Sequence, residues 1–427
     1  MTAPGNAAAS AEDGRQDSMR SAIVLGAGMI GVSTALHLQK RGWQVVIVDR
    51  RGPGEETSHG NAGIIQSEAV QPYAMPRDVI SLARIGFGRA NDVRYRLAAL
   101  PRQAGPLLRY WWNSEPHRHE RISMAYATLA AQSVPEHGVL IDQSGSDNLI
   151  QRDGYLHVFR DRAGFDAAIA KVEHVGAVWN VPYRLLDGAA LRALEPSVGE
   201  RIIGGIHWTA PWSVRDPGRL VKNYAELFVR NGGTIEIGDA ASLRQTAQGW
   251  SVAVNGGIIE APVAVVALGP WSPSFLRPYG YRFPMVMKRG YHRHFAGGAP
   301  LTRALLDVDR GYVVAPMARG LRITTGADLA DFDMPANDTQ LKRSEQYARE
   351  FIDLGTSVDA EPWFGTRPFL ASMLPVIGEA PRHRGLWLHF GHGHQGFTMG
   401  AASGRLIAEM MTGEAPYIDP APFMPRS

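Results

Sequence analysis

The sequence predicts an α/β protein in which a parallel sheet is covered by helices and a second sheet is inserted between its parts. Three observations predict this fold class. Residues 21–49 read as a strand, a glycine turn, a helix and a second strand. Residues 386–413 again pass from a strand through glycines into a helix. Between them, several segments alternate apolar and polar residues, as strands with one buried face do.

The first glycine turn has the spacing of a dinucleotide-binding loop. Gly26, Gly28 and Gly31 form a G-x-G-x-x-G pattern after the apolar run 23–25. In such loops the first glycine allows the sharp turn, the second lets a pyrophosphate approach the backbone, and the third lets the helix pack on the strand. The free N–H groups at the helix N-terminus favour phosphate. The expected contacts are Gly26, Ala27, Gly28, Met29, Ile30 and Gly31.

An acidic residue closes the second strand. Asp49 follows the apolar run 45–48 and lies 23 residues after Gly26, where an acid can bind ribose hydroxyls. We therefore add Asp49 and the adjacent Arg50 to the expected cofactor contacts. The alternative interpretation is a glycine-rich turn in an ordinary α/β unit.

Composition excludes several classes of protein. The 427 residues include 44 basic and 41 acidic side chains, and a net charge of +3 does not indicate nucleic-acid binding. The absence of cysteine excludes disulfides, cysteine-ligated iron–sulfur clusters and a thioether-linked cofactor. Residues 1–18 are small and polar and are expected to be a disordered extension. No charge-free apolar run of membrane-spanning length occurs.

The remaining elements are expected in chain order. Asp216 followed by Pro217 predicts the capped start of a helix that ends near Asn231. Helices are expected in patches over 77–112, within 118–144, and at 164–176 and 339–354. Strands are expected within 151–161, 234–243, 249–269 and 281–328. Residues 204–220 are expected to form a strand and a loop that lead into the helix ending near Arg230, and 386–413 a strand, a glycine turn and a helix.

Four motifs occur together along the chain. They are GAGMIG (26–31) with Asp49, TSHGNAG (57–63), VVALGPWS (265–272) and GTRP with GHGHQGFTMG (365–400). In this order they resemble the D-amino-acid oxidase/dehydrogenase family of flavoproteins, which includes glycine and sarcosine oxidases. The likeness extends from Ser21 over essentially the whole chain, and the bacterial D-amino-acid dehydrogenase branch looks nearest.

The resemblance implies non-covalent FAD and a glutathione-reductase-type fold, in which a Rossmann-like FAD-binding domain carries an inserted antiparallel-sheet substrate domain. It places the FAD-binding domain at 19–80, 210–273 and 361–427, and the substrate or cap domain at 81–209 and 274–360.

The resemblance also implies further cofactor contacts. The loop that approaches the flavin carries Ser58, Asn61, Ala62 and Gly63, and Gly269 ends a strand beside the cofactor. A helix N-terminus near the flavin pyrimidine would stabilise the negative charge of the reduced ring. The residues expected at that junction are Gly393, Gln395, Gly396, Phe397 and Thr398.

Four side chains are the candidates for catalysis. Arg367 matches the arginine of the family that binds the substrate carboxylate, and its guanidinium suits bidentate binding; the alternative is a structural salt bridge. Tyr291 and Tyr312 each follow a glycine in a strand expected over the flavin, where they would contact substrate or pack in the core. His59 would influence protonation of the amine or be an exposed loop histidine.

Two histidine pairs have a spacing that would allow both members to bind a metal. His392 and His394 lie two apart in a glycine turn, and His292 and His294 share one face of a strand. Neither pair has a third ligand at usable spacing, so no metal is expected.

The expected function is FAD-dependent oxidation of a D-amino acid or a secondary amino acid such as a proline analogue. Hydride would pass from the substrate α-carbon to flavin N5 and leave an imino acid. Either a quinone or oxygen would accept the electrons. The alternatives are an oxygen-using oxidase of glycine or sarcosine type, an NAD(P)-dependent reductase and a non-catalytic dinucleotide-binding subunit. A cytoplasmic protein is expected. The aromatic stretch 97–112 is expected to pack in the core of the helical part, and the alternative is a peripheral contact with the inner membrane.

Overall fold

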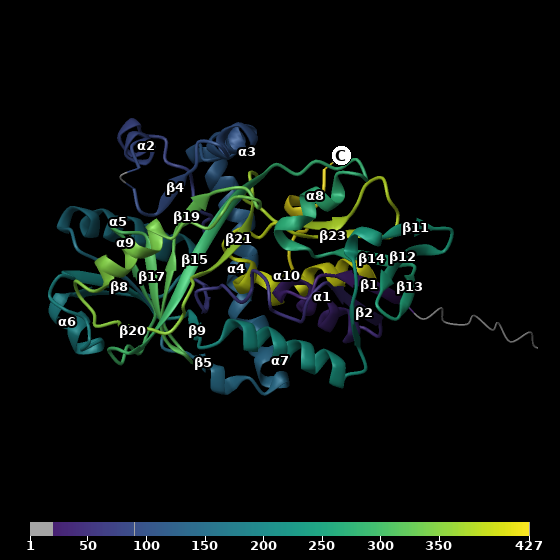
Figure 1. Cartoon of the computed structure of the whole chain (residues 1–427), viewed down its shortest axis with the longest axis horizontal. Coiled ribbons are helices and arrows are strands. Elements are labelled where there is room, and N and C mark those ends of the chain that lie inside the picture. Colours follow the sequence, from purple (N-terminus) through teal and green to yellow (C-terminus); the bar gives the residue numbers. More distant parts are fainter. Residues whose placement is uncertain (1–19, 89, 427) are drawn as a thin grey trace, which may run out of the picture.

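We describe the fold from a computed structural model, which covers residues 20–88 and 90–426 (Figure 1). The expected N-terminal extension at 1–18 lies outside these residues. Two large sheets form the two halves of the molecule. The N-terminal and C-terminal segments, purple and yellow in Figure 1, lie side by side in one half.

The first sheet is the expected parallel sheet. Its strand order is β10-β2-β1-β14-β23-β22, and only the edge strand β22 runs antiparallel to its neighbour. The strands are β1 (Ser21–Leu25), β2 (Gln44–Asp49), β10 (Thr234–Ile237), β14 (Val263–Val266), β22 (Val376–Glu379) and β23 (Leu386–Phe390). One face packs on α1 (Met29–Gln39), α7 (Pro217–Arg230) and α10 (Gly396–Thr412).

The alternation of side chains along β1 explains how this sheet is covered on both faces. Ala22 and Val24 belong to the core shared with α1 and α10. Ile23 and Leu25 face the opposite core, which contains Trp250. That core is closed by a three-stranded sheet of β11 (Arg244–Thr246), β12 (Gly249–Val254) and β13 (Gly257–Ala261).

The second sheet has eleven strands and differs from expectation in two ways. It is mixed, because β16–β6 and β19–β4 pair parallel while its other neighbours pair antiparallel. It also contains β21, which sequence analysis assigned to the FAD-binding segment and which pairs with β15 at eight positions. The strands are β4 (Val93–Tyr95), β6 (Tyr155–Phe159), β7 (Tyr183–Asp187), β8 (Gly204–Trp208), β15 (Met285–Gly297), β16 (Leu305–Asp307), β17 (Tyr312–Met317), β18 (Gly320–Thr325), β19 (Ala327–Leu329), β20 (Gly355–Ser357) and β21 (Trp363–Leu370).

Most helices match their expected ranges. Asp216 caps α7 by accepting a hydrogen bond from the backbone N of Arg219 at 2.9 Å, which confirms the predicted start of that helix. One helix expectation was too long: α9 (Thr339–Ala348) ends at Ala348 because the following residues turn into the core of the second sheet. The helical patches expected over 77–112 are two helices, which β4 separates where it pairs with β19. The other elements are α2 (Val79–Gly86), α3 (Leu100–Asn113), α4 (Pro116–Ser144), α5 (Arg162–Trp179), α6 (Gly188–Leu194), α8 (Ser272–Leu276), α9 (Thr339–Ala348), β3 (Ile64–Ile65), β5 (Ile150–Gln151) and β9 (Trp212–Val214).

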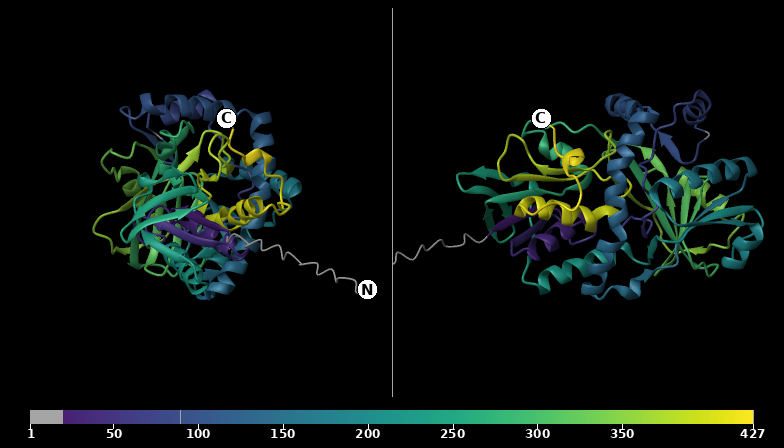
Figure 2. Two further views of the ribbon diagram at one scale, coloured as in Figure 1. Left: turned by 90° about the vertical axis from the view of Figure 1, so that its right-hand side faces the viewer. Right: turned by 180° about the vertical axis from the view of Figure 1, so that it is seen from behind.

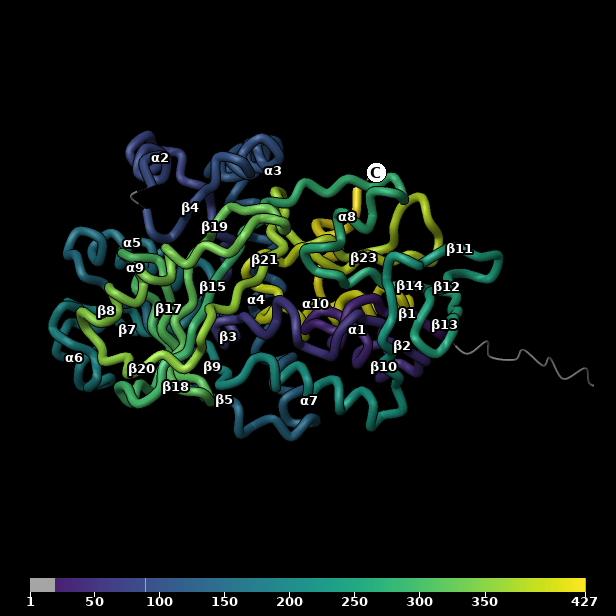
Figure 3. The backbone as a smooth tube through the Cα atoms, viewed as in Figure 1, coloured from purple at the N-terminus to yellow at the C-terminus, as the bar shows by residue number. Residues whose placement is uncertain are grey.

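The long helix α4 lies between the two halves, as the rear view in Figure 2 shows. It packs on α10 and α7 of the first half. The helices α2 and α3 stand at the outer edge near β4 and β19 (Figure 3). Within residues 20–88 and 90–426, none of the helices has the length and apolar character needed to cross a bilayer.

Candidate active site

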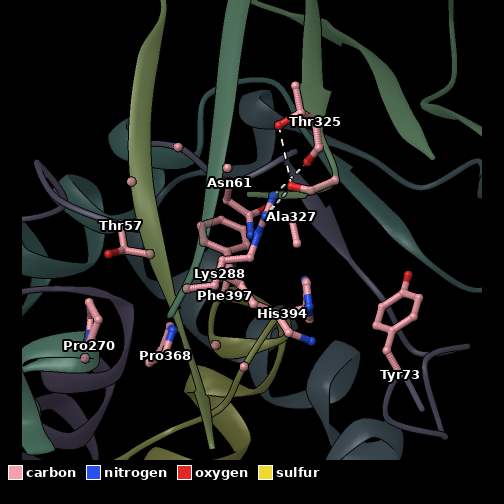
Figure 4. Close-up of a pocket in the computed structure, with 18 of the residues that line it drawn as sticks. Thr57, Asn61, Tyr73, Pro270, Lys288, Thr325, Ala327, Pro368, His394 and Phe397 are labelled. Carbon is pink, nitrogen blue, oxygen red and sulfur yellow. Dashed lines mark hydrogen bonds between the residues drawn. The ribbon is translucent and has the colours of Figure 1, made fainter. Parts of the chain in front are cut away.

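A cavity of about 1090 Å³ extends from the first glycine loop to the strands β15 and β21 of the second sheet. Sites for small ligands usually measure roughly 300–1,000 Å³, so this one admits a large cofactor together with a small substrate. Gly28 and Asp49 line it near the first glycine loop, and Arg367 and Lys288 line it on β21 and β15. Figure 4 labels Lys288, Phe397 and His394 among the lining side chains.

The three glycines of the first loop have the geometry that their expected roles require. Gly26 has φ +111°, and a Cβ there would lie 2.5 Å from the carbonyl oxygen of Ala267. A Cβ on Gly31 would lie 1.8 Å from the Gly26 oxygen, so the helix packs against the turn. On Gly28 a Cβ would meet only Ser58 Oγ, at 3.4 Å, which leaves that backbone open to the cavity.

Asp49 joins the end of β2 to the glycine loop. Its Oδ2 accepts a hydrogen bond from the backbone N of Ala27 at 2.6 Å, and burial raises its pKa. Arg50 pairs with Glu56 at 2.6 Å and lies over the Trp271 ring at 4.4 Å. Asp49, Arg50, Glu56 and Trp271 all line the cavity.

The second loop and the α10 N-terminus meet beside the first loop. Ser58 Oγ accepts from the backbone N of Met29 at 3.1 Å, which ties the second loop to α1. Gln66, which sequence analysis missed, lines the cavity; its backbone N donates to Thr398 Oγ1 and its side chain accepts from Gln395. Most residues expected near the flavin line the cavity: Ser58, Asn61, Ala62, Gly269, Gly393, Gly396 and Phe397. Three of them do not reach its lining: Gly63, Gln395 and Thr398.

Arg367 extends from β21 into the cavity without an acidic partner. Its Nη1 donates to the Gly326 oxygen at 2.7 Å and its Nη2 to the Thr325 oxygen at 2.9 Å. In the described part of the chain it forms no ion pair, so the alternative of a structural salt bridge finds no support. Burial lowers its pKa to about 10, which leaves it charged at neutral pH. A Cβ on Gly290 would lie 2.5 Å from Arg367 Nη2, so the glycine makes room for the guanidinium.

The other catalytic candidates lie less favourably. Tyr291 does not line the cavity, and its hydroxyl donates to Asp328 at 3.0 Å on the far side of the sheet. Tyr312 lines the cavity, but its hydroxyl accepts from Arg160 at 3.4 Å. His59 lies outside the lining and close to the Trp363 ring, with its pKa lowered by burial. Arg367 is therefore the catalytic candidate whose polar group the fold brings to the cavity.

No role was assigned from the sequence to several other cavity residues, among them Lys288, Tyr73 and Tyr110. Lys288 is opposite Arg367 in the β15–β21 register, and its ammonium lies 3.5 Å from the Phe369 ring centroid. The rings of Tyr73 and His394 meet edge to face at 5.1 Å, and the Tyr110 hydroxyl donates to the Tyr73 carbonyl at 2.6 Å. Lys288 shares a strand face with Gly290, two residues later, and this spacing was the available signal.

The histidine pairs have partners other than a metal. His392 Nε2 lies 3.0 Å from Ser403 Oγ, His294 Nδ1 lies 2.8 Å from Asp359, and the His292 ring stacks on Trp363. Over residues 20–88 and 90–426, no group of three or more histidine and acidic side chains is arranged to hold a metal ion.

Comparison with known proteins decides the family. The model of the family described as DAO, FAD dependent oxidoreductase, matches residues 21–410. The chain belongs to this family. A D-amino acid dehydrogenase from Agrobacterium fabrum (strain C58) is 31% identical over 420 residues, which cover 93% of this chain and 96% of the relative. A D-amino-acid oxidase from Bradyrhizobium diazoefficiens is 29% identical over 95% of this chain and 98% of its own length.

The fold of this family member is likewise that of solved flavoenzymes. The glycine oxidase structure from Geobacillus kaustophilus superposes with a TM-score of 0.72 at 18% identity, over 95% of this chain and 98% of its own. The protein is thus an FAD-dependent amino-acid dehydrogenase or oxidase, which confirms the resemblance and the expected cofactor. The alternatives of an NAD(P)-dependent reductase and of a non-catalytic subunit are set aside.

The cavity fits FAD in this DAO-family chain. The open backbone at Gly28 and the N-terminus of α1 suit the pyrophosphate, and Asp49 lies where the ribose is expected. A Cβ on Gly269 would meet nothing within 4 Å, so this cavity-lining backbone is also open to a ligand. Gly396 and Phe397 bring the N-terminus of α10 to the cavity, where it favours negative charge.

Proposed function

We propose that the enzyme oxidises the Cα–N bond of a D-amino acid, or of a secondary amino acid such as a proline analogue, to an imino acid. The observation that carries this proposal is the cavity-lining guanidinium of Arg367, which two backbone carbonyls orient and which pairs with no carboxylate of the described residues. A guanidinium can bind an α-carboxylate through two parallel hydrogen bonds. The name of the Agrobacterium relative, D-amino acid dehydrogenase, supports the D configuration.

The side chains of this chain act mainly by positioning the substrate. Bound FAD supplies the oxidising power by accepting a hydride from the substrate α-carbon. Arg367 fixes the carboxylate, and this contact restricts where the α-carbon lies. Tyr73 and Tyr110 line the cavity, and the ring of Tyr110 is buried. Burial, together with Lys288 and Arg367, lowers the pKa of His394 well below 6.5. At neutral pH the His394 imidazole is therefore uncharged and does not act as an acid toward the substrate amine.

The test is anaerobic mixing of the holoenzyme with a panel of amino acids. The panel pairs each D-amino acid with its L enantiomer and adds D- and L-proline, glycine and sarcosine. Bleaching of the flavin by D-amino acids or proline analogues is the expected result. Bleaching only by the L enantiomers of primary amino acids, or only by glycine, would contradict the proposed substrate class.

An additional surface favours electron transfer to a membrane acceptor. We name residues 77–88 and 90–121 the hood; they carry eight arginines and four acidic residues. The hood exposes several large apolar side chains, and α2 buries none of its residues. The most exposed are Val79 (80%), Ile80 (83%), Phe87 (78%), Leu97 (75%), Leu108 (67%) and Trp112 (55%).

This combination suits an anionic lipid surface, because arginine binds phosphate headgroups and apolar side chains enter the interface. Leu82, Leu97 and Leu107 of the hood also line the cavity, so such a contact would hold the substrate side of the cavity near the bilayer. A quinone dissolved in that bilayer is then the favoured acceptor, and oxygen is the competing one.

A further inference from the structure

Two basic side chains face the same cavity from directly opposite positions on neighbouring strands. Lys288 of β15 pairs with Arg367 of β21 in antiparallel register, and both line the cavity. Side chains opposite each other in such a pair lie close together, and like charges there are destabilising unless something offsets them. The pair therefore needs an explanation beyond the family's single carboxylate-binding arginine.

Alternation along β15 shows that Lys288 is directed into the cavity. Lys288 and Gly290 both line it, whereas the side chains between and after them, Arg289 and Tyr291, do not. The Arg289 guanidinium donates to carbonyl oxygens of Asp331 and Met334 away from the cavity. Arg289 shows that a basic side chain on this strand can point away from the cavity, whereas the Lys288 ammonium points into it.

The described residues offer Lys288 no carboxylate. Its Nζ donates to Tyr110 Oη at 3.4 Å and lies 3.5 Å from the Phe369 ring centroid and 4.4 Å from that of Tyr110. Only 7% of the residue is exposed. The acidic residues that line the cavity, Asp49, Glu56, Asp92 and Asp239, form no ion pair with Lys288 or Arg367. An ammonium in such surroundings lacks the anion that would offset its desolvation.

The two charged groups lean in opposite directions along the strands. The Arg367 guanidinium lies over Gly290 and bonds the carbonyls of Thr325 and Gly326. The Lys288 ammonium lies over Phe369, which is two residues beyond Arg367 on β21. Because the guanidinium and the ammonium point apart, they are better placed to bind two separate anionic groups of one ligand than to share a single carboxylate.

We infer that Lys288 binds a second anionic group on the substrate, so that the enzyme prefers amino acids with an acidic side chain or an acidic N-substituent. This inference rests on the proposed function, in which Arg367 binds the α-carboxylate. Lys288 then determines specificity: it contacts the end of the substrate remote from the reacting carbon. Tyr110 orients the ammonium, and the aromatic wall excludes water from the ion pair.

The test measures binding of two unreactive probes to the holoenzyme, glutarate and its monoamide glutaramate, by calorimetry and by the change in flavin absorbance. The probes match in length and differ by one negative charge. We expect glutarate to bind at least about tenfold more tightly at pH 6.5, since a charge-assisted hydrogen bond is worth about 1.5–3 kcal/mol. In Lys288→Met the ratio should fall to about one while the Kd of glutaramate stays unchanged.

Controls separate this inference from the proposed function. Lys342→Met removes the same charge from the exposed face of α9 and should leave both Kd values unchanged. Arg367→Lys should weaken both probes together; if it weakens neither, the proposed function fails, whatever Lys288 does. Equal wild-type affinities, a preference that survives in Lys288→Met, or equal weakening of both probes by Lys288→Met would overturn the inference. FAD content and Tm of each variant verify folding, and Lys288→Gln provides a second neutral side chain.

Discussion

At the scale of the residue, Gly290 determines where Arg367 can lie. A Cβ at position 290 would come within 2.5–2.7 Å of the guanidinium atoms, whereas the glycine backbone is not in the left-handed region. Gly290→Ala should therefore displace the guanidinium without straining the strand. We expect kcat/KM to fall by between about tenfold and a hundredfold, because small misplacements of a bound substrate are costly.

The matched control for this prediction is Gly256→Ala, in the β12–β13 turn, where a Cβ would meet nothing within 4 Å. Steady-state kinetics and flavin content of both variants decide the outcome. Unchanged kinetics in Gly290→Ala would mean that the guanidinium position is not critical.

The affinity of the cavity for the dianion glutarate should depend on pH through the single residue Lys288. Burial and Arg367 lower the pKa of Lys288 to about 7. Its neighbours stay fixed between pH 6 and 8, because the pKa of His394 lies well below 6.5, those of Tyr73 and Tyr110 are raised above 10, and that of Arg367 is about 10. Farther away, next to Tyr73, burial raises the pKa of Glu68 to about 7, and the Lys288→Met variant separates its titration from that of Lys288.

Lys288 is charged below pH 7 and loses its proton above it, so the ion pair with a dianion weakens as pH rises. The Kd of glutarate should increase by up to about tenfold per pH unit above pH 7, since each binding event must then take up a proton. The Kd of glutaramate should stay flat, and so should both values in Lys288→Met. A glutarate affinity independent of pH from 6 to 9 would show that Lys288 does not carry the charge.

At the scale of the element, two glycines of the strand, turn and helix at 21–39 have different roles: one leaves room for the cofactor and the other lets the helix pack on the strand. Gly28→Val should leave the fold intact and remove FAD, because its Cβ would occupy only the open side that faces the cavity. Gly31→Ala should instead lower the Tm of the apoprotein, since its Cβ would lie 1.8 Å from the Gly26 oxygen and force α1 off the sheet. Flavin absorbance and thermal melts measure both effects. Full flavin occupancy in Gly28→Val would show that this turn does not bind the cofactor.

The sequence predicted those elements whose signals are local. The glycine loop, the Asp216 cap and the α10 junction each depend on residues close together in the chain. The helix range 77–112 was interrupted because β4 forms through pairing with β19, more than two hundred residues away. The role expected of Tyr291 finds no support because successive side chains in a strand alternate, and Gly290 already faces the cavity.

At the scale of the whole molecule, the cavity joins elements that sequence order keeps apart. The sequence offered only the two-residue spacing between Lys288 and Gly290 as a signal, because the importance of Lys288 depends on the register of β15 against β21. The mixed character of the second sheet depends in the same way on the pairing of β16 with β6. The motifs were sufficient for the family and cofactor, since they are short and occur in a fixed order.

The hood makes a prediction for the molecule as a whole. The holoenzyme should sediment with vesicles that contain phosphatidylglycerol and should bind pure phosphatidylcholine at least about tenfold more weakly, because arginine charges supply much of the attraction. The double variant Ile80→Ser and Phe87→Ser should lose most of this binding. Ile258→Ser, an equally exposed apolar site on β13, is the control. Equal binding to both lipids, or none, would contradict the proposed contact.

The most direct test of the account is the reduction of bound flavin in Arg367 variants under anaerobic conditions. Arg367→Ala should require at least about tenfold more substrate for half-maximal reduction, and Arg367→Lys should be intermediate because it keeps the charge but loses the bidentate fork. FAD content and Tm should change little, since other residues line the cavity near the first glycine loop. If Arg367→Ala reduces its flavin with the wild-type dependence on substrate concentration, Arg367 does not bind the carboxylate and the proposed function is wrong.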